Sequence, residues 1–201
     1  MIYLVGMGPG HINHLTREAV EIISNVEHNI AFGRIAETAH QLTRKVTTAH
    51  KLEDVVKLLK HKGDTAILAS GDACFYGILD FLQSKQVKIA RIIPGITSFQ
   101  YMMNQLQISW QKSTFFSLHG RNQNYHDILA SDLAIILTDT RNSPDTISKK
   151  LFELGGAGTI YVGFDLSYDT EIILEKQIGE PIPEISSLST VVIVIERPDA
   201  A

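Results

Sequence analysis

The chain of 201 residues contains one cysteine, Cys74, and no long apolar run. A single cysteine excludes an intramolecular disulfide, so we expect no secreted, disulfide-stapled scaffold and place the protein in a reducing cytoplasm. No apolar run approaches the ~20 residues that a membrane helix needs, and the first residues lack the basic and apolar regions of a signal peptide. We therefore expect no membrane partner.

Positive charge is also in short supply. Lys and Arg number 18 against 22 Asp and Glu, which leaves a net charge of −4, and there is no polybasic run. Proteins that follow nucleic-acid phosphates cluster Lys and Arg, so we expect no nucleic-acid partner. The hydrophobic share of 44% and the charged share of 20% are typical of a globular protein with one large or two small domains.

A glycine loop stands at the start of the chain. The apolar run Ile2-Tyr3-Leu4-Val5 leads into Gly6-Met7-Gly8-Pro9-Gly10, ahead of a helical pattern. Cofactor pockets of α/β proteins form at such strand-to-helix loops. The spacing GxGxG differs from the GxGxxG of dinucleotide sites, Pro9 has no N–H, and no Lys follows as in a phosphate-binding loop. The pattern favours a ligand without phosphate, the alternative being a plain strand-to-helix turn.

Strands and helices alternate through the first half of the chain. Helical spacing predicts helices over residues 15–23, 52–59, 75–82 and 99–106, and apolar runs predict strands over residues 2–5, 29–33, 65–69 and 87–93. Three of these strands end in glycine-bearing loops, at residues 6–10, 70–77 and 94–98. Because the carboxyl ends of parallel strands meet at one edge of a sheet, we expect the three loops to share one pocket.

The pattern changes near residues 109–112, and the second half is rich in strands with short connections. Strands are expected over residues 113–118, 133–137, 159–163, 171–178 and 190–195, with one helix that Pro144 begins and Gly155 ends. Short connections favour antiparallel pairing. We therefore predict an α/β protein of two domains, residues 1–111 with a mostly parallel sheet and glycine-rich loops, and residues 112–201 with a mixed sheet.

Three motifs occur together in the order and spacing of one enzyme family: GMGPG at 6–10, SGDACFYG at 70–77 and IPGITS at 93–98. Through them the chain resembles the tetrapyrrole (corrin and porphyrin) methyltransferases over essentially its whole length. The resemblance implies two α/β domains with S-adenosylmethionine, the methyl donor, in the cleft between them, a tetrapyrrole substrate and a homodimer. GDACFYGI, IPGITSFQYM, Trp110 and SLHGR at 117–121 are similar to the branch that methylates carbon 5 of cobalt-precorrin-7 in cobalamin biosynthesis.

Two features of the chain bear on this resemblance. In some organisms the matching enzyme is fused to a decarboxylating methyltransferase; because this chain ends at Ala201, we expect the carbon-5 activity alone and cooperation with a separate decarboxylating enzyme. The family's usual GDPGFYG loop has proline and glycine where this chain has Ala73 and Cys74. These residues change the backbone freedom of the loop, and we expect them to alter cofactor affinity rather than the reaction class.

The resemblance also assigns cofactor contacts. Some of these residues have a structural alternative, Phe75 as a core residue and Asp72, Thr97 and Ser98 as helix caps. The implied contacts are Gly8, Pro9, Gly71, Asp72, Phe75, Thr97 and Ser98 in the first domain and Thr138 and Gly163 in the second.

Substrate binding and proton movement are assigned to other residues. A reduced tetrapyrrole supplies its own carbon nucleophile, so catalysis consists mainly of positioning. His119 is the candidate for moving a proton, with a loop-bonding histidine as the alternative. Arg121 is the candidate to hold a substrate carboxylate through two parallel hydrogen bonds, with an exposed, solvated arginine as the alternative. Gly120 and Met102 complete the predicted substrate contacts, and for Met102 the alternative is packing on a helix face.

Other functions stay open on the sequence alone. Within the family they are another tetrapyrrole position, or a uroporphyrinogen, diphthamide or ribosomal-RNA methyltransferase, against which the SLHGR stretch argues. A nicotinamide-dependent oxidoreductase needs an acidic residue at the end of its second strand, where this chain has Gly33-Arg34. A non-catalytic binding module is the third alternative. His11 and His14 have no third ligand at suitable spacing, so we expect no protein-bound metal, and Cys74, without a basic partner, is not expected to be a nucleophile.

Overall fold

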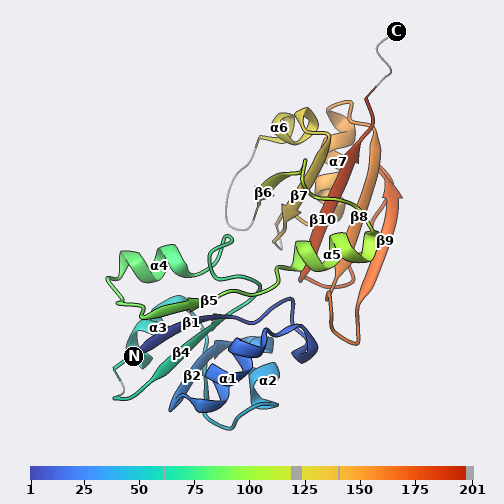
Figure 1. Ribbon diagram of the computed structural model, residues 1–201. Helices are drawn as coiled ribbons and strands as arrows, with labels where there is room; N and C mark the ends of the chain where they lie inside the picture. The colour runs from blue at the N-terminus through green and yellow to red at the C-terminus, as the bar shows by residue number, and fades with distance from the viewer. Residues whose placement is uncertain (61, 119–123, 140, 198–201) are drawn as a thin grey trace. The chain divides into compact units, whose positions relative to one another are not determined.

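The computed structural model describes residues 1–60, 62–118, 124–139 and 141–197 (Figure 1). Its contacts divide the chain into two compact units, residues 1–98 and 99–201. The boundary that we predict near residue 111 lies further along the chain, after helix α5 (Ser98–Leu106). None of the helices in the described segments is long and apolar enough to cross a membrane.

The first unit is built on a parallel sheet of five strands in the order β3-β2-β4-β1-β5. The pairs β1–β4, β1–β5, β2–β3 and β2–β4 are all parallel. The strands are β1 (Ile2–Gly6), β2 (His28–Phe32), β3 (Val46–Ala49), β4 (Thr65–Ala69) and β5 (Arg91–Ile93), and the helices are η1 (Ile12–His14), α1 (Arg17–Asn25), α2 (Gly33–His40), α3 (Leu52–Leu58) and α4 (Leu79–Ser84).

Both faces of this sheet are covered, because alternate residues of its central strands join different apolar clusters. Val5 and Leu68 pack with residues of α1 and α2, whereas Leu4 and Ile67 pack with residues of α3 and α4. All five residues of β4 are buried. Burial on both faces explains why β4 reads as a continuous apolar run rather than as an alternating one.

The second unit holds a mixed sheet in the order β6-β7-β10-β8-β9. The pair β6–β7 is parallel, and the other three pairs are antiparallel. The prediction of a mixed sheet is confirmed. The strands are β6 (Thr114–Ser117), β7 (Leu133–Leu137), β8 (Gly158–Phe164), β9 (Ile172–Gln177) and β10 (Ser189–Ile195), and the helices besides α5 are α6 (Tyr125–Ala130) and α7 (Pro144–Glu153).

Helix α7 follows the start and stop signals in its sequence. The Ser143 hydroxyl accepts a hydrogen bond from the Thr146 N–H, at 3.3 Å, and Pro144 takes the first helical position. The helix ends at Glu153, just before Gly155, whose φ of 81° suits glycine. Ile147 and Leu151 of this helix are fully buried in the core of the second unit.

Two predicted elements are shorter in the structure. The helix predicted from Phe75 begins only at Leu79, because Tyr76 has a φ of 51°, outside the right-handed helical region. The strand predicted from Val87 pairs only over Arg91–Ile93. Gln86, the residue before Val87, has a φ of 56°, and the Val87 N–H donates to the Leu82 carbonyl. The chain is therefore still in a turn after α4 at residues 86–87.

Candidate functional site: three glycine loops and an edge of the second sheet

The three glycine loops leave the first sheet from adjacent strands. Strands β4, β1 and β5 are neighbours and run parallel, with Gly6 opposite Ala69 and Val5 opposite Ile93. Residues 6–10, 70–77 and 94–98 therefore follow the same edge of the sheet. The loops thus meet at one edge, where open α/β sheets bind ligands, and that they share one pocket stays a prediction.

The first two loops are joined by a pair of backbone hydrogen bonds. The Gly8 N–H donates to the Gly71 carbonyl at 3.2 Å, and the Gly71 N–H donates to the Gly8 carbonyl at 2.8 Å. Both residues have positive φ, 68° and 63°. Glycine adopts this conformation without steric cost, so the residue type at both positions follows from the link between the loops.

The third loop joins them by close backbone approach. A Cβ on Gly6 would lie 2.6 Å from the Gly95 nitrogen and 2.8 Å from the Gly71 carbonyl oxygen. A Cβ on Gly95 would clash with the Gly71 carbonyl oxygen and would lie 2.8 Å from the Gly6 carbonyl carbon. The three loops are therefore packed backbone to backbone, with no room for a side chain at either position.

Asp72 fastens the second loop to the third. Its Oδ1 accepts the Cys74 N–H at 2.8 Å, and its Oδ2 accepts the Gly95 N–H at 3.1 Å. The alternative role as a cap for a helix beginning near Ala73 is wrong, because α4 begins only at Leu79. One carboxylate thus orders its own loop and links it to the neighbouring one through charge-assisted hydrogen bonds.

These contacts decide which ligands suit the loops. The N–H groups of Gly8, Gly71 and Gly95 are already bonded within the loop cluster. A pyrophosphate cradle needs such N–H groups directed at the ligand, together with positive charge. In the three loops Asp72 is the one charged residue. The cluster therefore disfavours a phosphate ligand and suits a neutral or cationic one.

The remaining loop residues offer apolar surface and hydroxyl groups. Phe75 is half-buried, with its ring 4.8 Å from that of Tyr76 in an edge-to-face arrangement, and Tyr76 and Ile96 are exposed. Pro9 and Thr97 are buried, and Ser98 is half-buried at the start of α5. Apolar walls with hydroxyl and carbonyl groups fit a ligand that carries an adenine ring and a sulfonium, so these residues fit S-adenosylmethionine.

The second unit brings the other two predicted cofactor contacts to one edge of its own sheet. Thr190 of β10 pairs with Leu137 on one side and with Gly163 on the other, so Thr138 and Gly163 flank the start of the same strand. The buried Thr138 hydroxyl donates to the Ser189 carbonyl at 2.8 Å. A Cβ on Gly163 would lie 2.6 Å from Leu166 Cδ2, so this glycine leaves room for Leu166.

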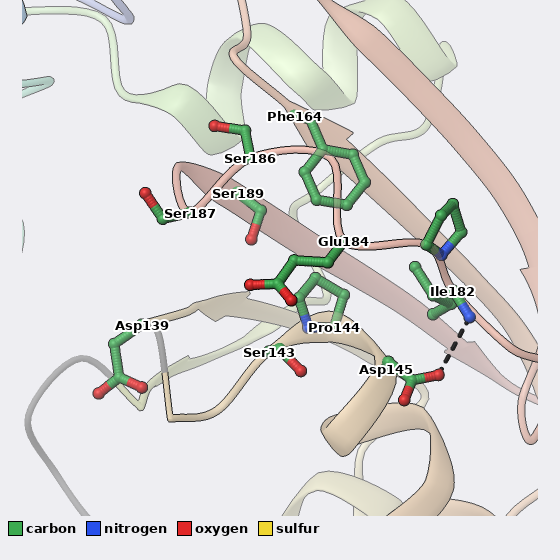
Figure 2. Close-up of a pocket in the computed structure, with 11 residues that line it drawn as sticks. Asp139, Ser143, Pro144, Asp145, Phe164, Ile182, Glu184, Ser186, Ser187 and Ser189 are labelled. Atoms are coloured by element: carbon green, nitrogen blue, oxygen red, sulfur yellow. Dashed lines mark hydrogen bonds between the residues drawn. The ribbon is translucent and has the colours of Figure 1, made fainter.

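A hollow beside this edge was not foreseen from the sequence (Figure 2). Its polar rim carries three carboxylates, Asp139, Asp145 and Glu184, and no Lys or Arg is among the residues that line it. The hydrogen bond from Lys149, together with that from the Ile182 N–H, lowers the pKa of Asp145, so this group is ionised at neutral pH. The hollow therefore disfavours the carboxylates of a tetrapyrrole. The other lining residues are Ser143, Pro144, Phe164, Ile182, Pro183, Ser186, Ser187 and Ser189.

The predicted catalytic and substrate-binding residues are not part of the loop cluster described above. His119, Gly120 and Arg121 fall outside the described residues. Met102 is fully buried on α5. Within residues 1–60, 62–118, 124–139 and 141–197, no group of three or more His, Cys, Asp or Glu side chains has the arrangement of a metal site.

Cys74 is exposed but electrostatically unsuited to act as a thiolate. Partial burial, and then the charge and hydrogen bonding of Asp72, raise the pKa of its thiol, with a further contribution from Asp80. Since the thiolate is the nucleophile, we expect iodoacetamide at pH 8 to alkylate Cys74 more slowly in the folded protein than in the urea-unfolded chain. Rates from mass spectrometry at matched pH measure this, and faster labelling of the folded protein would contradict it.

The fold and the loop cluster together define the class: a two-unit α/β protein with tied glycine loops at the carboxyl edge of a parallel sheet. The family model of the Tetrapyrrole (Corrin/Porphyrin) Methylases matches residues 1–182. The chain belongs to this family of methylases.

Two relatives are named for the same activity. A probable cobalt-precorrin-7 C(5)-methyltransferase of Methanocaldococcus jannaschii is 34% identical over 137 residues, which is 64% of this chain and 65% of that protein. The chain thus aligns with just under two thirds of the archaeal relative. The cobalt-precorrin-7 C(5)-methyltransferase of Salmonella typhimurium is 29% identical over 179 residues, covering 86% of this chain and 89% of that protein.

The fold recurs in solved structures. The uroporphyrin-III C-methyl transferase of Thermus thermophilus, complexed with S-adenyl homocysteine, superposes with a TM-score of 0.75 and 19% identity, over 96% of each chain. At this identity the likeness concerns the fold. It agrees with the predicted pair of α/β domains, one with a parallel sheet and one with a mixed sheet.

Proposed function

We propose that the protein transfers a methyl group from S-adenosylmethionine to carbon 5 of cobalt-precorrin-7, or of its metal-free equivalent, in cobalamin biosynthesis. Family membership supports a methylase, and the two relatives reported above support this substrate and this carbon. The SLHGR stretch at 117–121 supports the same branch of the family.

The observation that carries the cofactor assignment is the set of hydrogen bonds that link the three glycine loops to one another. The N–H groups of Gly8 and Gly71 are bonded to each other's carbonyl groups, and those of Cys74 and Gly95 are bonded to Asp72, so these four groups are not available to a phosphate. The loops bear the single negative charge of Asp72, which favours a ligand with a positive charge. This argues against a nicotinamide dinucleotide and for a sulfonium cofactor.

In this proposal the cofactor contacts in the first unit include Gly8, Pro9, Gly71, Asp72 and Phe75. Thr97, Ser98, Thr138 and Gly163 complete the contacts. When bound, S-adenosylmethionine supplies an electrophilic methyl group on its sulfonium. The loops contribute to the rate by holding the cofactor in a fixed position, because a well-placed methyl and carbon avoid a large entropic cost in the transition state.

The substrate assignments rest on residues 119–121 and on Met102. Arg121 holds a carboxylate of the tetrapyrrole through its planar guanidinium, and Gly120 lets the backbone come close to the ring. His119 moves a proton after methylation. Met102 on helix α5 is the other proposed substrate contact; its full burial favours the alternative of packing on a helix face. No protein-bound metal is part of the proposal, and any cobalt belongs to the substrate.

We also propose a cytoplasmic homodimer that works alongside a separate decarboxylating methyltransferase. The single exposed cysteine supports a reducing compartment. The dimer and the pathway partner are what the resemblance to the tetrapyrrole methyltransferases implies.

Equilibrium binding tests the cofactor part of the proposal. We expect isothermal titration to give micromolar binding of S-adenosylhomocysteine and no measurable binding of NAD⁺ at the same concentrations, about 10-fold or more apart in Kd. Adenosine is the control for recognition of the base alone. Tighter binding of NAD⁺ than of S-adenosylhomocysteine would refute the assignment.

A further inference from the structure

The connection between β8 and β9 is longer and more buried than a hairpin needs. It runs over residues 165–171, whereas most hairpin loops have about 2–5 residues. Asp165, Leu166 and Ser167 are buried, and Asp165 and Ser167 have φ of 46° and 70°. Two non-glycine residues in the left-handed region within three positions are costly, and such strain persists only where the surrounding structure enforces it.

A polar network enforces this conformation. The Asp165 carboxylate accepts the Ser186 hydroxyl at 2.8 Å and the Thr170 hydroxyl at 3.3 Å, and the Asp165 N–H donates to the Leu188 carbonyl at 3.1 Å. The Ser167 N–H donates to the Glu171 carboxylate. Asp165 is thus held through its own carboxylate and N–H, and Ser167 through the Glu171 carboxylate.

Glu171 also reaches helix α5. It accepts a hydrogen bond from the Tyr101 hydroxyl, and burial together with this bond and the charge of Glu171 raises the pKa of Tyr101 to about 12. Tyr101 therefore stays a protonated donor throughout the physiological range. The bond joins the loop to α5, the helix whose first residue is Ser98.

The same loop determines the surroundings of Gly163 and Thr138. The Leu166 side chain fills the space that a Cβ on Gly163 would occupy. Asp165 fixes Ser186 and Leu188, on the segment that borders the hollow in Figure 2, and the next residue, Ser189, accepts the Thr138 hydroxyl. A shift of the loop would therefore move the packing around both second-unit contacts.

We propose that Tyr101, Glu171 and Asp165 are positioning residues that hold the second-unit contacts and helix α5 in the arrangement that binds S-adenosylmethionine. This inference rests on the function proposed above and deepens it. The three residues act through Gly163, Thr138 and Ser98. Their role predicts that small, non-disruptive changes weaken cofactor binding while the fold persists.

Titration calorimetry with S-adenosylhomocysteine, together with Tm, tests this on the full chain. We expect Tyr101→Phe, which removes only the hydroxyl, to raise Kd about 10-fold, and Glu171→Ala, which removes two bonds, to raise it about 30-fold. Glu171→Gln keeps one accepting oxygen in place of two, so its Kd should lie between those of Glu171→Ala and the wild type. Tm of Tyr101→Phe should fall by a few degrees at most.

Tyr161→Phe is the matched control. Tyr161 on β8 stands opposite Glu175 on β9, and burial and the charge of Glu175 raise its pKa, but it belongs to the regular strand pair rather than to the loop. We expect this variant to bind S-adenosylhomocysteine like the wild type. Wild-type affinity in folded Tyr101→Phe, or equal losses in Tyr101→Phe and Tyr161→Phe, would overturn the positioning role. An absence of binding by the wild type would refute the proposed function and the inference together.

Discussion

Replacing Asp72 with alanine is expected to lower the free energy of unfolding by about 2–3 kcal/mol and the affinity for S-adenosylhomocysteine at least about 30-fold. The carboxylate accepts two backbone N–H groups, one from Cys74 and one from Gly95. Alanine leaves both donors without this partner and releases the third loop from the second. Urea unfolding and titration calorimetry measure the two effects.

The variant Asp72→Asn removes the charge and one of the two accepting oxygens. Its amide has one accepting oxygen, so one of the two N–H donors would face an NH₂ group. We expect its free energy of unfolding and its affinity for S-adenosylhomocysteine to lie closer to those of Asp72→Ala than to those of the wild type. Asp80→Ala is the control, because Asp80 is exposed in the first turn of α4. Equal effects of Asp72→Ala and Asp80→Ala would show that the loops are held by other means.

Gly95→Ala is expected to destabilise the first unit by about 3 kcal/mol or more and to abolish cofactor binding. The new methyl group would clash with the Gly71 carbonyl oxygen and press on the Gly6 backbone. Backbone atoms cannot turn aside as a flexible side chain does, so the loops must separate. The unfolding midpoint in urea and calorimetry with S-adenosylhomocysteine give the result.

Gly71→Ala is the comparison that separates a clash from a backbone preference. Gly71 has a φ of 63°, but a Cβ there would lie 3.6 Å from the Thr97 Cα, an ordinary contact. We expect a loss of only about 1–2 kcal/mol, the cost of a left-handed alanine. If Gly95→Ala proves as mild as Gly71→Ala, the loops are not packed backbone to backbone as described.

Much of the fold is predictable because its elements carry strong local signals. Strand β4 is a continuous apolar run, and α7 is bounded by Pro144 and Gly155. Elements without such signals were not predicted: α2 has no side-chain cap at Phe32, and β3 exposes Thr47 and Thr48 at the edge of the sheet. Their conformation depends on neighbouring strands and helices, which a single sequence does not display.

Part of the candidate site is likewise predictable from the sequence, and part is not. That loops 6–10, 70–77 and 94–98 converge follows from parallel strands ending at one edge, and the sequence suffices for it. The bond from the Gly95 N–H to Asp72 joins residues 23 positions apart, and local patterns do not predict it. The strained loop after β8 was missed for a similar reason, since the bond from the Ser186 hydroxyl to Asp165 joins residues 21 positions apart.

The most direct test of the proposed function is one reaction. Purified protein is incubated with S-adenosylmethionine carrying a ¹³C-labelled methyl group and with cobalt-precorrin-7, and the product is examined by mass spectrometry and NMR. We predict a gain of one methyl group, located at carbon 5, and a markedly slower gain with the Asp72→Ala variant at the same sub-saturating cofactor concentration. A methyl group at another ring position, or no methylation by a protein that binds S-adenosylhomocysteine, would contradict the substrate assignment.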